Sequence, residues 1–329
     1  MMQSLFNVLA GRPALCVYDV TTRCNSRCAM CSIWKRREKE MPLKDIKKVF
    51  SDLKRFGIHT LFLQGGEPLV RRDVFEVVKI LDDMGFHTVV LSNGILLDEK
   101  VLKKLDSLNR SGRIFVTVSL DTLDRKKYIK IRGVDKFDVV TSNIRLLAKH
   151  PGLKGSVHAT VTSINYNELD DVREFVHSLG LDFTFNSYND TKNYASSGDK
   201  SLHLGNCMEN VITEMSKVSQ KLPPLYRPFI KDNIRYLRGE DVGRCDAFVH
   251  SFRLTSEGML TPCLEFPPMF DLKKEDINRK WGEWSKKMAC PVKRCYEKTP
   301  CFYGCTRGTG SIRKRPFAAL NGLIYTLRR

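Results

Sequence analysis

The 329-residue chain is 42% apolar and 28% charged, which is typical of a soluble globular protein. No apolar run approaches the ~18 residues that a transmembrane helix needs, and the N-terminal residues show no signal-peptide pattern, so we expect a cytoplasmic protein. The formal charge of +18 favours an anionic partner, although it equally suits a lysine-rich solvated surface. In the cytoplasm, eleven cysteines favour metal binding or redox chemistry over structural disulfides.

Short β-rich segments alternate with helical segments from residue 15 to about residue 186. Three of the helical patterns end at Gly57, Gly85 and Gly180, where glycine terminates a helix without strain. Six strands in this alternation predict a parallel sheet with right-handed crossovers, and ligands are then expected at the carboxyl ends of the strands. The predicted strands are 14–20, 59–64, 87–92, 113–120, 156–162 and 182–187.

The rest of the chain follows a different pattern. Residues 191–244 are expected to form a connection of mixed helix and loop. Residues 245–310 are rich in cysteine and have weak secondary-structure signals, as expected of a small module held by metal. Residues 311–329 form a basic amphipathic tail that suits either an anionic membrane surface or packing on the protein itself.

Three cysteines, Cys24, Cys28 and Cys31, lie within eight positions directly after the first predicted strand, with Arg23 and Arg27 beside them. Structural zinc fits poorly, because it needs four protein ligands. Three thiolates with one open metal position suit an iron–sulfur cluster that binds a substrate directly. The sequence therefore predicts a [4Fe–4S] cluster in this loop.

This C-x3-C-x2-C pattern, after the first strand of such a chain, resembles the radical S-adenosylmethionine (SAM) enzymes. The resemblance covers about residues 14–190 and implies a partial (β/α)6 TIM-like barrel. It also implies that the open iron of the cluster chelates SAM. Reduction, by a protein such as ferredoxin or flavodoxin, would then yield a 5′-deoxyadenosyl radical. Met30 stands where the family often has an aromatic residue, and its thioether is expected to pack on adenine.

A "GGEP" motif follows the second predicted strand and comprises Gly65, Gly66, Glu67 and Pro68. Two glycines let the backbone approach a ligand closely, and a carboxylate accepts an ammonium group. By resemblance to the family, this motif binds the methionyl amine of SAM.

Polar residues also follow the third and fourth predicted strands. The resemblance implies that Asn93 lies near the ribose, that Ser119 contacts the ribose or methionyl part, and that Arg132 contacts the carboxylate. Asp121 is a further predicted SAM-binding residue. Alternatively, Ser92 and Asn93 form a simple turn, and Asp121 caps the helix that follows it.

A second group of cysteines resembles the SPASM or shorter twitch extension of radical enzymes, which binds auxiliary iron–sulfur clusters. The group consists of Cys245, Cys263, Cys290, Cys295, Cys301 and Cys305. The resemblance implies that Cys245, Cys263 and Cys305 share one cluster and the other three a second. However, the x4 spacing between Cys290 and Cys295 departs from the usual x2, and no cysteine follows Cys305. We predict at least one auxiliary [4Fe–4S] cluster; the alternative is a zinc knuckle made by the last four cysteines.

Cys16, Cys207, His87 and His158 are expected to pack in the core. Four polar residues after the sixth strand either orient a substrate or only fill the loop. They are Tyr188, Asn189, Asp190 and Tyr194.

Together these features predict an enzyme that cleaves SAM, acting on a substrate that the sequence does not identify. The positive charge favours an anionic peptide, a phospholipid or a sugar phosphate. One alternative is a non-catalytic, metal-bearing protein that binds nucleic acid, although few aromatic residues are interleaved with the basic runs. Another is an iron–sulfur electron carrier or redox sensor, which would not need the GGEP motif.

Overall fold

The computed structural model describes residues 7, 12–189, 191, 200–298, 301–304 and 307. Within these residues the strands form one curved sheet in the order β6-β5-β4-β3-β2-β1-β7-β8-β9. Strands β1 to β6 are parallel to one another. They are β1 (Leu15–Thr21), β2 (Thr60–Gly65), β3 (His87–Ser92), β4 (Ile114–Ser119), β5 (Lys154–Val161) and β6 (Asp182–Ser187).

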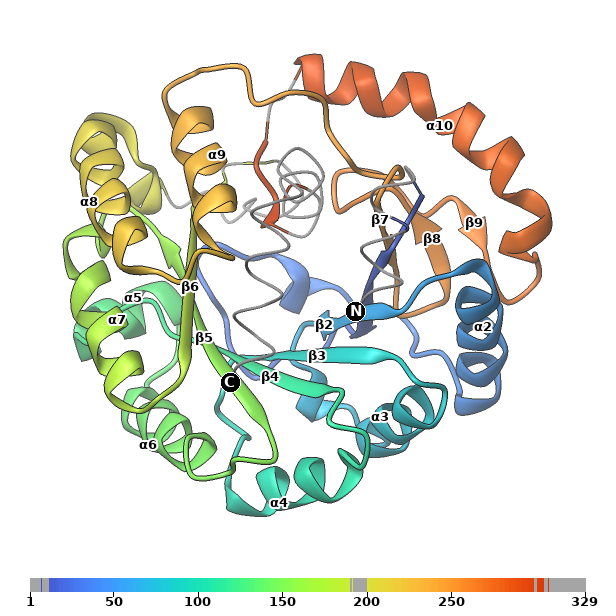
Figure 1. Ribbon diagram of the computed structural model, residues 1–329, viewed down its shortest axis with the longest axis horizontal. Helices are drawn as coiled ribbons and strands as arrows, with labels where there is room; N and C mark the ends of the chain where they lie inside the picture. The colour runs from blue at the N-terminus through green and yellow to red at the C-terminus, as the bar shows by residue number, and fades with distance from the viewer. Residues whose placement is uncertain are drawn as a thin grey trace.

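Helices cover the outer side of these six strands (Figure 1). In β4, Val116 and Val118 are fully buried, whereas Thr117 and Ser119 are half-buried. Because alternate side chains point to opposite faces, the fully buried side packs against the helices and the half-buried side faces the concave inner side. The helices are α2 (Leu43–Phe56), α3 (Val74–Asp83), α4 (Glu99–Leu108), α5 (Arg125–Arg132), α6 (Phe137–Leu147) and α7 (Leu169–Ser178).

The structure confirms the predicted partial (β/α)6 barrel, because the described sheet is open, with β6 and β9 at its edges. Strands β3 and β6 have the predicted bounds, and the largest shift is in β5, which begins at Lys154 instead of residue 156. Helix α2 ends at Gly57, whose φ of 104° is a left-handed conformation that glycine adopts without strain. Short 3-10 turns complete the loops: η1 (Ile33–Lys35), η2 (Pro68–Val70), η3 (Tyr166–Glu168), η4 (Lys200–Leu202) and η5 (Gly205–Cys207).

The C-terminal region has more regular structure than predicted. Strand β7 (Ser251–Leu254) pairs in parallel with β1 and continues the sheet of the barrel, followed by β8 (Met259–Thr261) and β9 (Phe270–Asp271). The prediction of weak secondary structure was therefore wrong here. Helices α8 (Met208–Lys221) and α9 (Arg227–Leu237) precede these strands, and α10 (Ile277–Lys298) follows them.

Helix α10 was missed because its apolar face is narrow among many charged residues and Pro291 interrupts the pattern. The helix is held by aromatic contacts instead. Trp284 stacks on Phe270 of β9 at 4.4 Å, and Trp281 lies 5.1 Å from Phe56 of α2, both distances being between ring centroids. None of the described helices is long and apolar enough to span a bilayer, and the tail (311–329) lies outside the described residues.

A buried ion pair joins β7 to the barrel. Arg253 donates its Nε to Asp19 Oδ2 at 2.7 Å, and Gln64 donates its Nε2 to Asp19 Oδ1 at 3.1 Å. Asp19 is fully buried and Arg253 is 4% exposed. The two charges therefore depend on each other, because either one alone would be costly at this depth.

We expect Arg253→Leu to lower the free energy of unfolding by about 3–5 kcal/mol, because it leaves the Asp19 carboxylate buried without its cation. Urea unfolding followed by circular dichroism would measure this. The control is the double variant Asp19→Asn/Arg253→Leu, which removes both charges and should regain much of the loss. Equal stability of the single and double variants would contradict the expectation.

Candidate active site

The cysteine loop after β1 is held by backbone hydrogen bonds on both sides. On one side, Gly66 N donates to Thr21 O and Glu67 N donates to Arg23 O, each at 2.8 Å. On the other side, Ala29 N donates to Ile131 O at 2.9 Å and Arg27 N donates to Arg132 O at 3.2 Å. The GGEP loop and the end of α5 thus fix the backbone that carries the three thiols.

Three glycines permit this close packing. A Cβ atom would lie 2.1 Å from Thr21 O at Gly65, 2.1 Å from Arg23 O at Gly66, and 2.2 Å from Arg27 O at Gly133. Such distances are too short for any side chain, so the two glycines of the GGEP motif serve the approach of the cysteine loop itself. The motif alone had suggested that these glycines let a ligand approach; Gly133 had no predicted role, although its place directly after Arg132 was a signal.

The Glu67 carboxylate joins the loops after β2 and β3. It is fully buried and accepts hydrogen bonds from Leu69 N at 3.1 Å, Ser92 Oγ at 2.9 Å and Asn93 N at 2.7 Å. Burial raises its pKa to about 7, although these donors lower it. Two of these donors share Oε1 and one binds Oε2, so the carboxylate keeps acceptor capacity and its use as an ammonium acceptor stays a prediction. Pro68 begins η2 directly after it.

Asn93 reaches from the end of β3 to the cysteine loop. Its Nδ2 donates to Asn25 Oδ1 at 2.7 Å and to Ser26 Oγ at 3.2 Å, and lies 3.9 Å from Cys24 Sγ. The side chain is therefore beside the first of the three thiols.

Asp121 and Arg132 form a buried pair beside Cys28. Asp121 Oδ2 lies 2.6 Å from Arg132 Nε, and its Oδ1 accepts from Thr160 N at 2.9 Å. Asp124, not Asp121, caps α5, so the capping alternative for Asp121 was wrong. The Arg132 guanidinium also acts on the Cys28 thiol: burial raises the pKa of that thiol, whereas Arg132 lowers it.

The three thiols share a buried environment. Burial raises the pKa of Cys24 to about 11 and that of Cys31 to about 12, and negative charge on Cys28 raises both further. The metal-free thiols are therefore neutral at neutral pH, and a metal would have to displace their protons.

The described residues contain no three His, Cys, Asp or Glu side chains that could hold one metal ion. A [4Fe–4S] cluster does not require such convergence, because each thiolate binds a different iron. The donor set, three thiols in a fixed loop with Arg132 beside one of them, fits such a cluster.

The loop after β6 packs against other parts of the chain. Tyr188 is buried with Met30, Ile131 and Leu202, so Met30 is 5% exposed and its contact with adenine stays a prediction. Asn189 exchanges two hydrogen bonds of 2.9 Å with the backbone of Phe302. It thus connects the barrel to the C-terminal segment, a role that differs from both expectations, substrate contact and loop filling. Asp190 and Tyr194 lie outside the described residues.

The inner side of the sheet is polar at β4 to β6. His158 shares hydrogen bonds with Thr184 Oγ1 at 2.8 Å and with Asn186 Oδ1 at 2.6 Å, and burial lowers its pKa. Ser119 neighbours His158 in register. The prediction of simple core packing for His158 missed this network, which an inward strand position could have signalled. Cys16 is fully buried in the core, as predicted.

His87 opens β3 and is half-buried. Cys207 is also half-buried, packs against the main core, and donates its thiol to Leu204 O at 2.7 Å. Neither residue lies in the cysteine loop.

The second group of cysteines is only partly brought together. Burial raises the pKa of Cys301 to about 12. Negative charge on Cys245 and on Cys295 also raises this pKa, whereas Arg307 lowers it. Cys290 is exposed on α10. Charge on Cys245 and Cys295 thus acts on Cys301, and the pairing of cysteines that the resemblance implied stays a prediction. Cys305 lies outside the described residues.

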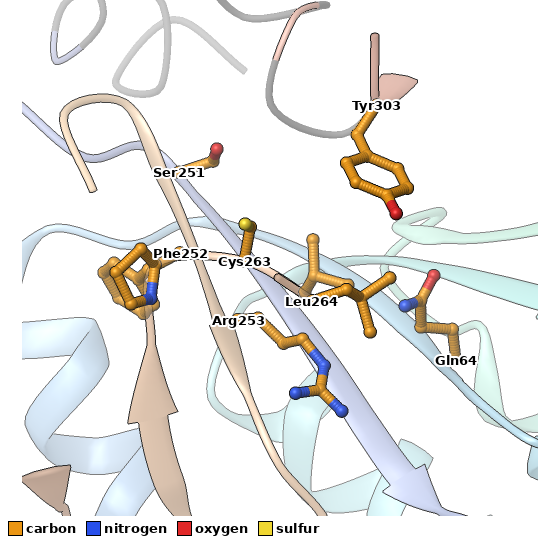
Figure 2. A pocket seen from close by; sticks show the side chains of 9 residues that line it. Gln64, Ser251, Phe252, Arg253, Cys263, Leu264 and Tyr303 are labelled. Carbon is orange, nitrogen blue, oxygen red and sulfur yellow. The ribbon is translucent and has the colours of Figure 1, made fainter. Parts of the chain in front are cut away.

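Cys263 lines a small pocket at the junction of β1, β2 and β7, together with Gln64, Arg253, Leu264 and Tyr303 (Figure 2). Its volume is about 10 Å³, roughly the space of one water molecule. This pocket is therefore too small to hold an organic substrate.

Comparison with known proteins identifies the barrel. Residues 18–179 match the family described as the Radical SAM superfamily. These residues form a radical SAM domain. A [4Fe–4S] cluster and SAM are the cofactors of this superfamily.

Two sequence relatives carry the name GTP 3′,8-cyclase. GTP 3′,8-cyclase 1 of Mycobacterium tuberculosis is 30% identical over 52% of this chain and 50% of its own length, so the chain spans about half of that relative. The probable GTP 3′,8-cyclase of Methanothermobacter marburgensis is 27% identical over 75% of this chain and 82% of its own length.

Solved structures share the fold of the radical SAM domain and its extension. Streptococcus suis SuiB, bound to its precursor peptide SuiA, aligns over 82% of this chain and 64% of SuiB, with a TM-score of 0.66 and 16% identity. The protein anSMEcpe, with bound AdoMet and the Cp18Cys peptide, aligns over 95% of this chain and 98% of its own, with a TM-score of 0.62 and 17% identity.

We expect Gly133→Ala to lower the iron bound at the cysteine loop and the stability of the protein, because its Cβ would lie 2.2 Å from Arg27 O. The matched control is Gly112→Ala. Gly112 has a φ of +66°, close to the +69° of Gly133, but no atom lies within 4 Å of its Cβ. In both variants the new side chain sits on left-handed backbone, at a cost of about 1 kcal/mol. The difference between the two variants in iron content and melting temperature therefore measures the effect of the contact with Arg27 O. Equal iron content and equal melting temperature in the two variants would contradict this role of Gly133.

Proposed function

We propose that the protein is a radical SAM enzyme that cleaves SAM reductively and uses the resulting carbon radical on a substrate. The observation that carries this proposal is the loop of three thiols, fixed on both sides within a radical SAM domain. Cys24, Cys28 and Cys31 would hold a [4Fe–4S] cluster. When bound, this cluster supplies the electron that splits SAM into methionine and a 5′-deoxyadenosyl radical. The domain favours this function over a nucleic-acid-binding protein or an electron carrier.

The residues of the chain would bind and orient SAM beside the thiols. Glu67 O and Pro68 O accept from Val70 N and Arg71 N, so the methionyl ammonium group would be left to Gly66 O and the remaining acceptor position of the Glu67 carboxylate. Asn93, beside Cys24, is suited to the ribose, and Ser119 at the inner end of β4 to the ribose or methionyl part. Asp121 contacts Arg132 at Nε, and a guanidinium has five N–H donors, so Arg132 retains donors for the carboxylate of SAM.

The C-terminal cysteines would bind at least one auxiliary [4Fe–4S] cluster. The charge effects of Cys245 and Cys295 on Cys301, and the opposing effect of Arg307, support these three cysteines as ligands. In this proposal residues 14–190 form the catalytic core, 191–244 the connection, 245–310 the auxiliary region and 311–329 the tail.

For the substrate we propose a small anionic molecule, with GTP as the first candidate. Sequence relatives named for GTP match over as much as 80% of the chain, whereas the peptide-bound neighbours are under 20% identical and share the fold alone. This departs from the peptide, phospholipid or sugar phosphate that the sequence favoured. The polar inner side around His158 and Asn186 offers hydrogen-bonding groups to such a molecule.

Protein reconstituted with iron and sulfide without oxygen should convert SAM to 5′-deoxyadenosine when dithionite is added. Cys28→Ala should abolish this product and lower the iron content, since the cluster loses one of its three ligands. The control is Cys207→Ala, which alters a half-buried thiol on the core and should leave both unchanged. Zinc in place of iron at the cysteine loop, or no 5′-deoxyadenosine, would refute the proposed function.

GTP should increase 5′-deoxyadenosine formation and be consumed, because a bound substrate captures the radical. Chromatography of the reaction would measure both compounds, with ATP as the control nucleotide. If GTP has no more effect than ATP or buffer, GTP is not the substrate. That result would leave the proposed cleavage of SAM standing, because the dithionite experiment tests it without GTP.

A further inference from the structure

The segment around the cysteine loop is unusually basic. Residues 20–39 contain six basic residues and one acidic residue, a net charge of +5 in 20 residues, whereas the whole chain has +18 in 329. This stretch therefore carries more than a quarter of the net charge in about a sixteenth of the length. The SAM site accounts for only one nearby cation, Arg132, which lies on α5 and outside this segment.

Four cations of this segment are exposed, and the described structure gives none of their charged groups an acidic side-chain partner, although the backbone N of Lys39 donates to Glu257 Oε1 at 3.2 Å. By contrast, Arg23 is paired with Glu40 at 2.8 Å. We call the four, together with Trp34, the cationic face. The four cations are Arg27, Lys35, Arg37 and Lys39.

Trp34 lies close to the thiols in the sequence and contacts two of the four cations. It lies in η1, three residues after Cys31, and Arg27 and Lys35 lie 5.7 Å and 5.3 Å from the centre of its ring. Tryptophan and arginine are enriched at protein interfaces, because they combine large contact area with charge or hydrogen bonding. Arg27 directly precedes Cys28 and Trp34 follows Cys31 by three residues, so the cationic face adjoins the thiols along the chain.

We propose that the cationic face is the docking surface for a small acidic protein that delivers single electrons to the cysteine loop. This proposal rests on the proposed function, because each cleavage of SAM consumes one electron that must come from outside the chain. The carrier is a reduced flavin protein or iron–sulfur protein with an acidic surface. It loses one electron and the site held by Cys24, Cys28 and Cys31 gains it; no atom is transferred.

Charge complementarity favours this partner over a membrane. The large apolar side chains exposed in the described part of the chain are Leu96, Val139 and Val249, none of which belongs to the cationic face, so the face lacks an apolar anchor. An electron carrier needs only a small, transient contact, for which opposite charges increase the rate of encounter. Unpaired cations beside an electron acceptor meet that requirement.

The test compares two double variants in the full-length protein. Lys35→Glu/Lys39→Glu reverses two charges of the cationic face. Lys100→Glu/Lys104→Glu reverses two exposed lysines of α4 that have the same spacing and likewise no acidic partner in the described structure. Both variants change the net charge by the same amount, so a difference between them reports position and not total charge.

The first readout is the binding of an acidic flavodoxin, measured by titration calorimetry at low and high salt. We expect wild type and the α4 variant to bind similarly, and the variant of the cationic face to bind at least about tenfold more weakly at low salt. The difference should shrink at high salt, because the ions screen exposed charges. Equal affinity of the two variants would overturn the proposal.

The second readout is 5′-deoxyadenosine formation with two reductants. With reduced flavodoxin, only the variant of the cationic face should be slow; with dithionite, both variants should match wild type. A loss with both reductants would overturn the proposal, because it would mean that the substitutions damage the SAM site. If wild type fails with dithionite, the proposed function is refuted, while the binding measurement still decides whether the cationic face docks the carrier.

Discussion

The structure depends on main-chain hydrogen bonds that clamp one loop between two others. The cysteine loop has no regular secondary structure over most of its length, yet Gly66 and Glu67 bind it on one side and Ile131 and Arg132 on the other. A loop fixed in this way loses little further conformational entropy when it binds a metal. The glycines at 65, 66 and 133 exist because this contact leaves no room for a Cβ atom.

The two buried carboxylates around the cysteine loop were expected to bind a ligand, but their observed partners belong to the protein. Glu67 and Asp121 are both fully buried and both bind groups of the protein: the first joins two loops, and the second holds Arg132 beside Cys28. Buried charges are tolerated when they are paired or accept several hydrogen bonds. These two carboxylates therefore also act as a scaffold for the residues around the thiols.

The barrel was predictable from local patterns, because each strand is β-rich and several helices end at a glycine. The three thiols were predictable for the same reason, since their spacing is local. The partners of Glu67 and Asp121 were not, because they come from residues 25 and 39 positions farther along the chain. The same limit applies to Asn189, whose partner Phe302 is 113 residues away. In α10, the apolar residues recur at helical spacing but are few among the charged ones, and the helix is stabilised by stacking of Trp284 on a distant strand.

The pairing of β7 with β1 makes the C-terminal region indispensable to the barrel. All seven residues of β1 are fully buried, and β7 shields one side of this strand. Truncation before residue 251 would turn this apolar strand into a bare edge, a template for aggregation. The first strand of the cysteine-rich region is thus an integral part of the barrel's sheet.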